Sequence, residues 1–288
     1  MPSTKHLKIK KQSSPTQQGL SYSVVIATYN RHSFLQKALK SVYSQTLPPY
    51  EVVVVDDGSS DTTSLIKKEY PNITYIYQDN QGVAAARNKA IQHTTTHWIA
   101  FLDDDDIWEA TKQQKQMLLL DNSSFLWCYC DEQWYKNNKQ INIPKKYHKP
   151  KNNTFVNHCS YCNIAPSGVV MHKKIFKDIG DFDETFKICE DFDLWLRVLQ
   201  HYPLGYLDEK LLQKHSHQHN QLGFSPNIEH YRAKALQKHL NTPFANIVKK
   251  ELIQKYTYLY KGAEKRNNPQ ADIYRKKLQK LTLHAITP

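Results

Sequence analysis

Short apolar runs alternate with amphipathic stretches over residues 21–102. The apolar runs are rich in β-branched residues and lie at 21–27, 51–55, 73–77 and 98–102. Apolar positions after Ser33, over 62–69 and from about residue 80 indicate helices, and we expect Ser33 to cap the first of them. Strands that alternate with helices predict a parallel, doubly wound α/β sheet with right-handed crossovers.

The pattern changes after residue 106. We expect a helix at 107–120, a hairpin of 125–135 with 140–143, a polar loop at 145–153 and a short strand at 169–171. A brief helix and a turn then precede an amphipathic helix that begins near residue 190. Further helices are expected at 232–240, 245–260 and 271–281.

These patterns divide the chain into segments of different character. Residues 1–20 predict a disordered basic tail, and 21–225 predict one α/β domain. Residues 21–122 predict a half of the sheet with mostly parallel strands, and residues 123–225 predict a half with parallel and antiparallel strands. Residues 226–288 predict a helical extension.

Four consecutive aspartates follow the strand expected at 98–102: Asp103, Asp104, Asp105 and Asp106. Two unit charges about 4 Å apart repel by roughly 4 kcal/mol at an effective dielectric near 20, so the cluster needs a positive partner. Ligands of open α/β sheets bind beyond the carboxyl ends of the strands, and a divalent cation with a phosphorylated substrate is the simplest partner. Helix capping explains one residue, because Asp106 with Glu109 resembles a capping box.

Other polar residues also follow expected strands or open helices. The loop at 56–61 contains Asp57, and turn chemistry explains that loop equally well. The helix near residue 82 begins with small residues and exposes N–H groups that suit phosphate. Arg87 on this helix could contact that phosphate or pair with the aspartates. Glu190 and Asp191 open a later helix, where the helix dipole favours ionised carboxylates.

The formal charge of +12 on 288 residues calls for an anionic partner. No nucleic-acid module is recognisable, so an anionic membrane surface is the favoured partner. The first twenty residues lack the apolar core of a secretory signal and no run is long enough to cross a bilayer, so we expect the chain to be cytoplasmic.

The five cysteines and a group of histidines offer a further metal hypothesis. Cys128 and Cys130 with Cys159 and Cys162 could form a four-thiolate zinc site, but Cys is also an ordinary apolar residue in a strand. Three histidines lie in a polar stretch that we interpret as a solvated loop, with metal or phosphate contact as the alternative: His215, His217 and His219.

Six motifs resemble those of the family 2 glycosyltransferases with the GT-A fold, and they occur in the family's order. They are VVIATYNR at 24–31, VVDDGSSD at 54–61, NQGVAAARN at 80–88, FLDDDDIW at 101–108, IGDFDE at 179–184 and EDFDLWLR at 190–197. The resemblance covers about 20–200. One region departs from the family pattern, since 212–223 lacks the arginine- and glycine-rich loop that often precedes a histidine.

The resemblance implies roles for particular residues. Tyr29 would pack against the nucleotide base, and Asp57 would accept a hydrogen bond from uracil. Asp103 and Asp105 fit the D-x-D element: Asp103 would contact ribose or the waters of the metal, and Asp105 would bind Mn²⁺ or Mg²⁺. Asp104 could exchange roles with Asp103.

The remaining implied roles concern the rest of the site and the reaction. Asp191, with Glu190 beside it, would be the catalytic base of a single displacement that inverts the anomeric carbon. The nucleotide-sugar site would also include Thr28, Arg31, Gly82 and Arg87.

We therefore expect a metal-dependent, inverting transferase that moves a sugar, from UDP above all, to a glycan or lipid-linked acceptor in surface polysaccharide or lipopolysaccharide assembly. Two alternatives keep the fold: a catalytically silent nucleotide-sugar-binding module and a nucleotidyltransferase. The second is disfavoured because 28–31 contains no glycine. A specific nucleic-acid binder is not expected.

Overall fold

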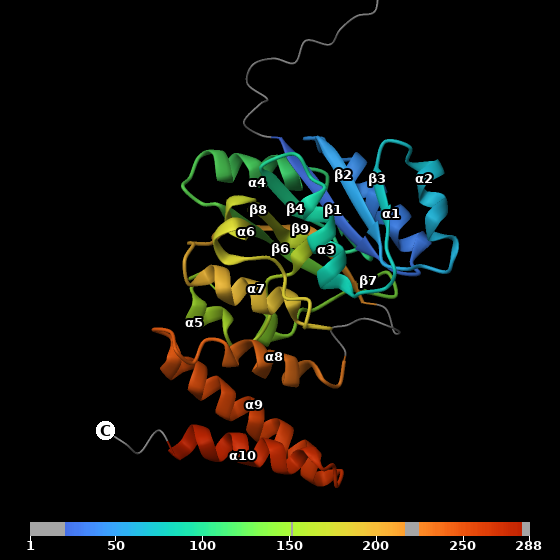
Figure 1. The fold of residues 1–288 in the computed structure, drawn as a ribbon. Coiled ribbons are helices and arrows are strands. Elements are labelled where there is room, and N and C mark those ends of the chain that lie inside the picture. Colours follow the sequence, from blue (N-terminus) through green and yellow to red (C-terminus); the bar gives the residue numbers. More distant parts are fainter. Residues whose placement is uncertain (1–20, 151, 217–224, 284–288) are drawn as a thin grey trace, which may run out of the picture.

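The computed structural model describes residues 21–150, 152–216 and 225–283. One sheet crosses the molecule in the order β3-β2-β1-β4-β8-β6-β9-β5, and β7 pairs with β6 (Figure 1). The strands are β1 (Tyr22–Thr28), β2 (Glu51–Asp56), β3 (Thr74–Tyr77), β4 (Trp98–Phe101), β5 (Asp106–Trp108), β6 (Trp127–Lys136), β7 (Lys139–Ile141), β8 (Val169–His172) and β9 (Gly205–Ser216).

Helices cover both faces of this sheet and continue beyond it (Figure 1). They are α1 (His32–Tyr43), α2 (Ile66–Glu69), α3 (Val83–Gln92), α4 (Lys112–Asp121), α5 (Phe155–His158), α6 (Lys174–Ile179), α7 (Glu190–Leu199), α8 (Ile228–Gln237), α9 (Ala245–Lys265) and α10 (Gln270–Leu283).

The first half of the domain is the expected parallel sheet. Strands β3, β2, β1 and β4 pair with one another in parallel. Val25 and Phe101 enter a core that contains residues of α3 and α7, whereas Val24 and Ala100 enter the opposite core with residues of α1 and α4. Burial on both faces explains why these strands read as continuous apolar runs.

The second half of the sheet is mixed. Strand β8 is antiparallel to both β4 and β6, and β9 is parallel to β6 and antiparallel to β5. The predicted hairpin is confirmed as β6–β7, with Asn137 and Asn138 at positive φ in its turn. Asn tolerates this conformation better than most residues, which accounts for the Asn-rich turn.

Helices α8–α10 lie where the sequence predicts helices, and their core is continuous with that of the sheet. Leu236, Leu252 and Tyr256 belong to the same buried cluster as Trp195 of α7. Within the described ranges, no helix is both long enough and apolar enough to span a bilayer.

Three local predictions are wrong. Residues 106–108 form β5 rather than the start of a helix, and α4 begins at Lys112. Ser33 lies inside α1, whose N-cap residue is Arg31. His215 is a residue of β9 and stacks on Tyr135 with ring centroids 5.2 Å apart, so it is not a loop residue.

Some predictions concern residues outside the described ranges. These residues are His217, His219 and the tail at 1–20.

The four cysteines considered as a zinc site lie on opposite faces of the sheet. Cys128 and Cys130 face one core, and Cys159 faces the other. The four thiols weighed as a zinc site therefore do not converge.

Candidate active site

The loops that follow β1 and β2 are joined at the carboxyl edge of the sheet. Asn30, at a φ of 53°, accepts hydrogen bonds at Oδ1 from the N–H groups of Ser60 (2.7 Å) and Asp61 (3.2 Å). Its own N–H donates to Ser59 Oγ at 2.8 Å. These contacts fix the loop that carries Tyr29, whose side chain is 49% exposed.

Asp57 is buried and fixes the start of α3. Its Oδ1 accepts hydrogen bonds from Gln78 Nε2 (2.7 Å) and the Gln81 N–H (2.9 Å), and its Oδ2 accepts one from the Gly82 N–H (2.8 Å). Gly82 has a φ of 96°, which glycine adopts without strain. The structure therefore brings the two predicted residues Asp57 and Gly82 into direct contact.

The acidic segment after β4 lies against the loop after β1. Asp104 accepts hydrogen bonds from Thr28 Oγ1 (2.8 Å) and Arg31 Nη1 (2.9 Å), and the same Nη1 contacts Asp105 Oδ2 at 3.0 Å. Burial raises the pKa of Asp104 to about 7, against the opposing charge of Arg31. Four predicted residues, Thr28, Arg31, Asp104 and Asp105, thus form one cluster.

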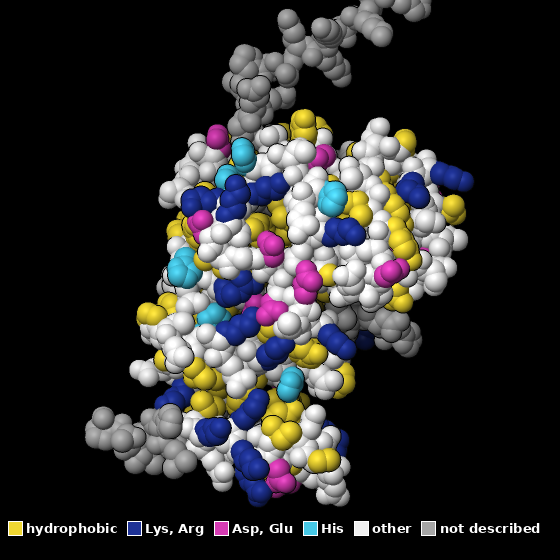
Figure 2. All heavy atoms as spheres, in the orientation of Figure 1, with side chains coloured by type: hydrophobic (Ala, Val, Ile, Leu, Met, Phe, Trp, Pro, Cys, Tyr) yellow, Lys and Arg dark blue, Asp and Glu magenta, His cyan; other side chains and the backbone are white. Residues whose placement is uncertain are grey.

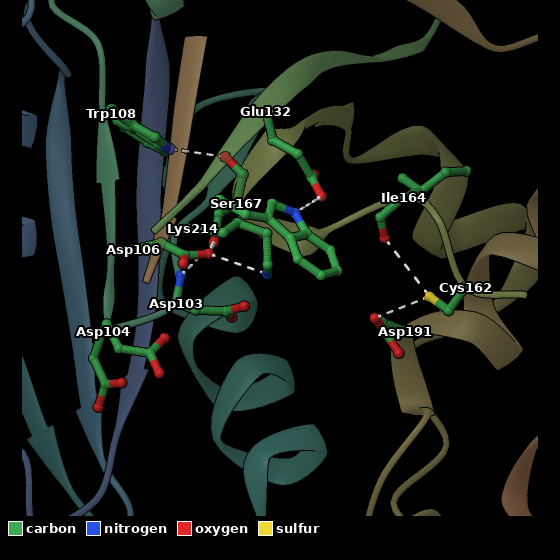
Figure 3. Close-up of polar contacts among 12 residues, drawn as sticks. Asp103, Asp104, Asp106, Trp108, Glu132, Cys162, Ile164, Ser167, Asp191 and Lys214 are labelled. Carbon is green, nitrogen blue, oxygen red and sulfur yellow. Dashed lines mark hydrogen bonds and ion pairs between the residues drawn. The ribbon is translucent and has the colours of Figure 1, made fainter. Parts of the chain in front are cut away.

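Ser167 and Lys214 hold the last residue of the acidic segment, and sequence reasoning identified neither. Ser167 Oγ accepts the Asp103 N–H (3.0 Å) and donates to Asp106 Oδ2 (2.6 Å), which lies 3.4 Å from Lys214 Nζ (Figure 3). Burial raises the pKa of Asp106 to about 8. Asp106 is therefore a buried residue of β5, and its interpretation as a helix cap is wrong.

Arg87 is buried and bridges two acidic segments of the site. Its Nη2 lies 2.6 Å from Asp103 Oδ1, and its Nη1 forms an ion pair with Glu190 at the start of α7. Asp103 and Glu190 raise the pKa of Arg87 against the effect of burial, so the guanidinium stays charged. The sequence left open whether Arg87 contacts phosphate or aspartate, and the structure shows the carboxylate pairs.

Asp191 is the second acidic residue of α7 and is partly exposed. Its Oδ1 accepts the N–H of Phe192 at 2.7 Å, and its Oδ2 accepts the thiol proton of Cys162 at 3.3 Å (Figure 3). Nothing in the sequence links Cys162 to Asp191, because 29 residues separate them.

The acidic segment contains the kind of donors that bind a divalent cation together with phosphate oxygens. In the part of the chain that the structure describes, no three His, Cys, Asp or Glu side chains are grouped so as to hold a metal ion. Mg²⁺ in phosphate sites is often held by one or two carboxylates together with substrate oxygens and water. Asp103, with a side chain 27% exposed, and Asp105 offer two such carboxylates in the same segment.

The sequence profile described as Glycosyl transferase family 2 matches residues 23–180. The chain belongs to this family. An uncharacterized glycosyltransferase of Rickettsia conorii is 31% identical over 195 residues, which cover 66% of this chain and 32% of that protein. This chain therefore matches only about a third of that relative's length.

Two further proteins have informative names or structures. Escherichia coli WfgD, a UDP-Glc:alpha-D-GlcNAc-diphosphoundecaprenol beta-1,3-glucosyltransferase, is 32% identical over 183 residues, covering 62% of this chain and 69% of WfgD. The structure of S. aureus TarS with UDP-GlcNAc matches 82% of this chain and 71% of that chain, with a TM-score of 0.67 and 20% identity.

A mannosyltransferase from Pyrobaculum calidifontis, solved with GDP-Man and Mn²⁺, matches 91% of this chain and 84% of that chain, with a TM-score of 0.60 and 15% identity. The likeness to these solved structures confirms the GT-A fold expected from the sequence.

Proposed function

We propose that this family member transfers a sugar from a UDP-sugar to a hydroxyl of a lipid-linked glycan, with inversion and with Mn²⁺ or Mg²⁺, in the assembly of a surface glycan such as lipopolysaccharide. The observation that carries the proposal is the pair of contacts made by Arg87. Its guanidinium contacts Asp103 of the acidic segment and also Glu190, the neighbour of Asp191. One side chain therefore joins the carboxylates proposed for the sugar donor to those proposed for the acceptor.

The donor half of the proposal assigns the nucleotide to β1 and β2. Tyr29 offers an exposed ring for the base. Asp57 has three hydrogen-bond donors on its two oxygens, and a carboxylate has about four lone-pair sites. Oδ2 therefore retains one site for the N–H of uracil. Asp103 and Asp105 hold the cation, which when bound offsets the charge of the departing diphosphate.

The acceptor half of the proposal assigns the base to Asp191. Its carboxylate takes the proton of the acceptor hydroxyl as that oxygen attacks the anomeric carbon from the face opposite the diphosphate. Arg87 is occupied by Asp103 and Glu190, so its role is to hold these two carboxylates rather than to receive phosphate directly. The names of WfgD and of the TarS complex support a UDP-sugar donor, and that of WfgD supports a diphosphate-linked acceptor.

The proposal includes a peripheral contact of the C-terminal helices with an anionic membrane at the cytoplasmic side. Residues 226–283 contain 13 Lys and Arg against 4 Asp and Glu, and this excess is most of the net charge of +12. Figure 2 shows Lys and Arg side chains on the face of the C-terminal helices that it presents. Tyr258 of α9 and Ile273 of α10 are 69% and 54% exposed beside these lysines. Exposed apolar side chains among basic residues are typical of helices that lie on anionic lipid.

The test measures transfer to a polyprenyl-diphosphate-linked N-acetylglucosamine and release of nucleoside diphosphate from UDP-, GDP- and TDP-sugars. Each donor is run with Mn²⁺, with Mg²⁺ and with chelator, beside Asp105→Ala. We expect metal-dependent turnover of a UDP-sugar that Asp105→Ala loses. UDP binding without turnover on any acceptor would favour a silent binding module, and absence of both would refute the proposal.

A further inference from the structure

We propose that Cys162 is a positioning residue for the catalytic base, in that its S–H group orients the Asp191 carboxylate and favours its ionised form. The inference rests on the proposed role of Asp191. It adds a residue outside the six family motifs, from the segment between α5 and β8.

The geometry gives each oxygen of Asp191 one donor. The Phe192 N–H donates to Oδ1 at 2.7 Å, and Cys162 Sγ lies 3.3 Å from Oδ2 (Figure 3). The first donor belongs to the backbone of α7 itself, whereas the second comes from a different segment. Two donors from different directions fix the rotation of a carboxylate that either donor alone would leave freer.

The thiol has a choice of acceptor, and the carboxylate is the better one. Cys162 Sγ also lies 3.7 Å from the carbonyl oxygen of Ile164. The contact with Asp191 is shorter and its acceptor carries charge, and hydrogen bonds to charged groups are the stronger ones. Burial raises the pKa of the Cys162 thiol well above its usual value, so the group keeps the proton that it donates.

The segment that carries Cys162 is attached to helices on two sides. Trp195 Nε1 of α7 donates to the Ile164 carbonyl at 3.1 Å, and Lys255 Nζ of α9 donates to the Ser160 carbonyl at 2.8 Å. These contacts hold the thiol at a fixed position relative to α7. A hydrogen bond from such a fixed donor can hold a side chain in one position, whereas a donor on a mobile loop would move together with the side chain.

Other charged or titratable groups also act on Asp191. Asp191 raises the pKa of Arg87 of α3 and that of Glu190 beside it, so both groups lie close enough to interact with its charge. Cys189 precedes Glu190 at the N-cap of α7. The charge of Arg232 of α8 lowers the pKa of both Cys162 and Cys189, against the larger effect of burial. Among the residues that the structure describes, the thiol of Cys162 is the group that donates a hydrogen bond to Asp191 from outside α7, so its removal isolates this single contribution.

The experiment compares the pH dependence of kcat for Cys162→Ala and Cys162→Ser, which differ only by a hydroxyl donor. Hydrogen bonding to a carboxylate lowers its pKa, so we expect Cys162→Ala to raise the acidic limb by about half a unit and lower kcat about 3–10-fold. Cys162→Ser should return the limb to the wild-type position or below. KM for the donor should change less than about twofold in both.

Cys159→Ala is the matched control. Cys159 is a buried thiol in the same segment, but its Sγ donates to the Val156 carbonyl at 3.2 Å and not to a carboxylate. We expect this variant to lose some stability and to keep the wild-type pH profile. Equal profiles for Cys162→Ala, Cys162→Ser and wild type would overturn the inference.

The outcome separates this inference from the proposed function. Asp191→Asn should lose transfer but keep UDP binding; full activity in that variant would refute the role of Asp191 itself. Loss of activity in Asp191→Asn with an unshifted profile in Cys162→Ala would refute only the role of Cys162. If Cys162→Ala does not fold, Cys162→Ser decides alone: a downward shift of the acidic limb by that stronger donor supports the inference, and an unchanged or upward-shifted limb contradicts it.

Discussion

Arg87 of α3 and Glu190 of α7 form a buried ion pair between two helices on the same face of the sheet. The other guanidinium nitrogen of Arg87 contacts Asp103, and Phe182 lies 5.5 Å from the guanidinium. The position of α7, and with it that of Asp191, therefore depends on the guanidinium of Arg87, which also contacts the acidic segment.

Replacement of Arg87 should destabilise the fold as well as the site. Arg87→Ala leaves two acidic side chains without their cation, and breaking a buried pair in this way typically costs about 3–5 kcal/mol. Arg87→Lys should lose less but still fail to contact both carboxylates, because an ammonium lacks the fork of a guanidinium. Urea unfolding measures both changes.

Arg275→Ala is the control for this effect. Arg275 pairs with Asp272 on α10, where both side chains are exposed. Exposed pairs contribute up to about 1 kcal/mol, so we expect a small change. An Arg87→Ala variant as stable as Arg275→Ala would contradict the structural importance of the bridge.

The metal proposal predicts a specific loss of binding. Asp105→Asn and Asp103→Asn should each weaken Mn²⁺-dependent UDP binding at least about tenfold, since each removes one of the two carboxylates proposed to bind the cation. Calorimetry with and without chelator separates the metal-dependent part of the affinity. Asp121→Asn, at the exposed end of α4, should bind as wild type does. Chelator-resistant binding in wild type would count against the metal.

The pKa of Asp104 predicts a pH-dependent gain from Asp104→Asn. Burial raises this pKa to about 7, whereas an aspartate in an unfolded chain titrates near about 3.9. The stability contributed by the protonated group is complete below about pH 4 and is lost as pH rises toward 7. Asparagine stays neutral, so we expect Tm to rise by a few degrees at pH 8 and by less at pH 5.

Melting curves between pH 5 and 8 measure this gain, with Asp121→Asn as a control that should show none. A gain that is constant with pH, or larger at pH 5, would show that the charge of Asp104 is not its origin.

The excess of Lys and Arg in the C-terminal helices predicts binding of the protein to anionic vesicles. Lys276→Glu with Lys280→Glu reverses two exposed charges near Ile273 on α10, and we expect binding to vesicles that contain phosphatidylglycerol to fall at least about tenfold. Lys40→Glu with Lys68→Glu makes the same change in net charge on α1 and α2. Equal effects of the two pairs would indicate net charge rather than a defined face.

The parallel half of the sheet could be predicted because its information is local. The central strands there, β1, β2 and β4, are apolar runs buried on both faces, and Val24 and Val25 show the burial that such a run implies. Strand β5 could not be predicted in this way. It has three residues, begins with an aspartate, and is formed through pairing with β9, so a local pattern could only indicate a cap.

The contacts within the site also divide into those that local sequence patterns indicate and those that long-range packing creates. The resemblance assigned Asp57, Arg87 and Asp191 to one site, and some of their partners also belong to the motifs: Gly82 contacts Asp57, and Asp103 and Glu190 contact Arg87. Ser167 and Cys162 lie outside the six family motifs, and they contact the site because β8 and α5 bring their segments to it. Such neighbours are determined by long-range packing rather than by spacing.

The late position of β9 in the chain has a consequence for the order of folding. Strands β1–β4 complete their mutual pairing within residues 22–101, but Asp106 of β5 pairs with Lys214, which follows it by 108 residues. Contacts between residues far apart in sequence form slowly, because closing a long loop is entropically unfavourable. During synthesis the acidic segment therefore gains its final register only after nearly the whole sheet has been made, and an incomplete chain would lack the contact that holds Asp106 in place.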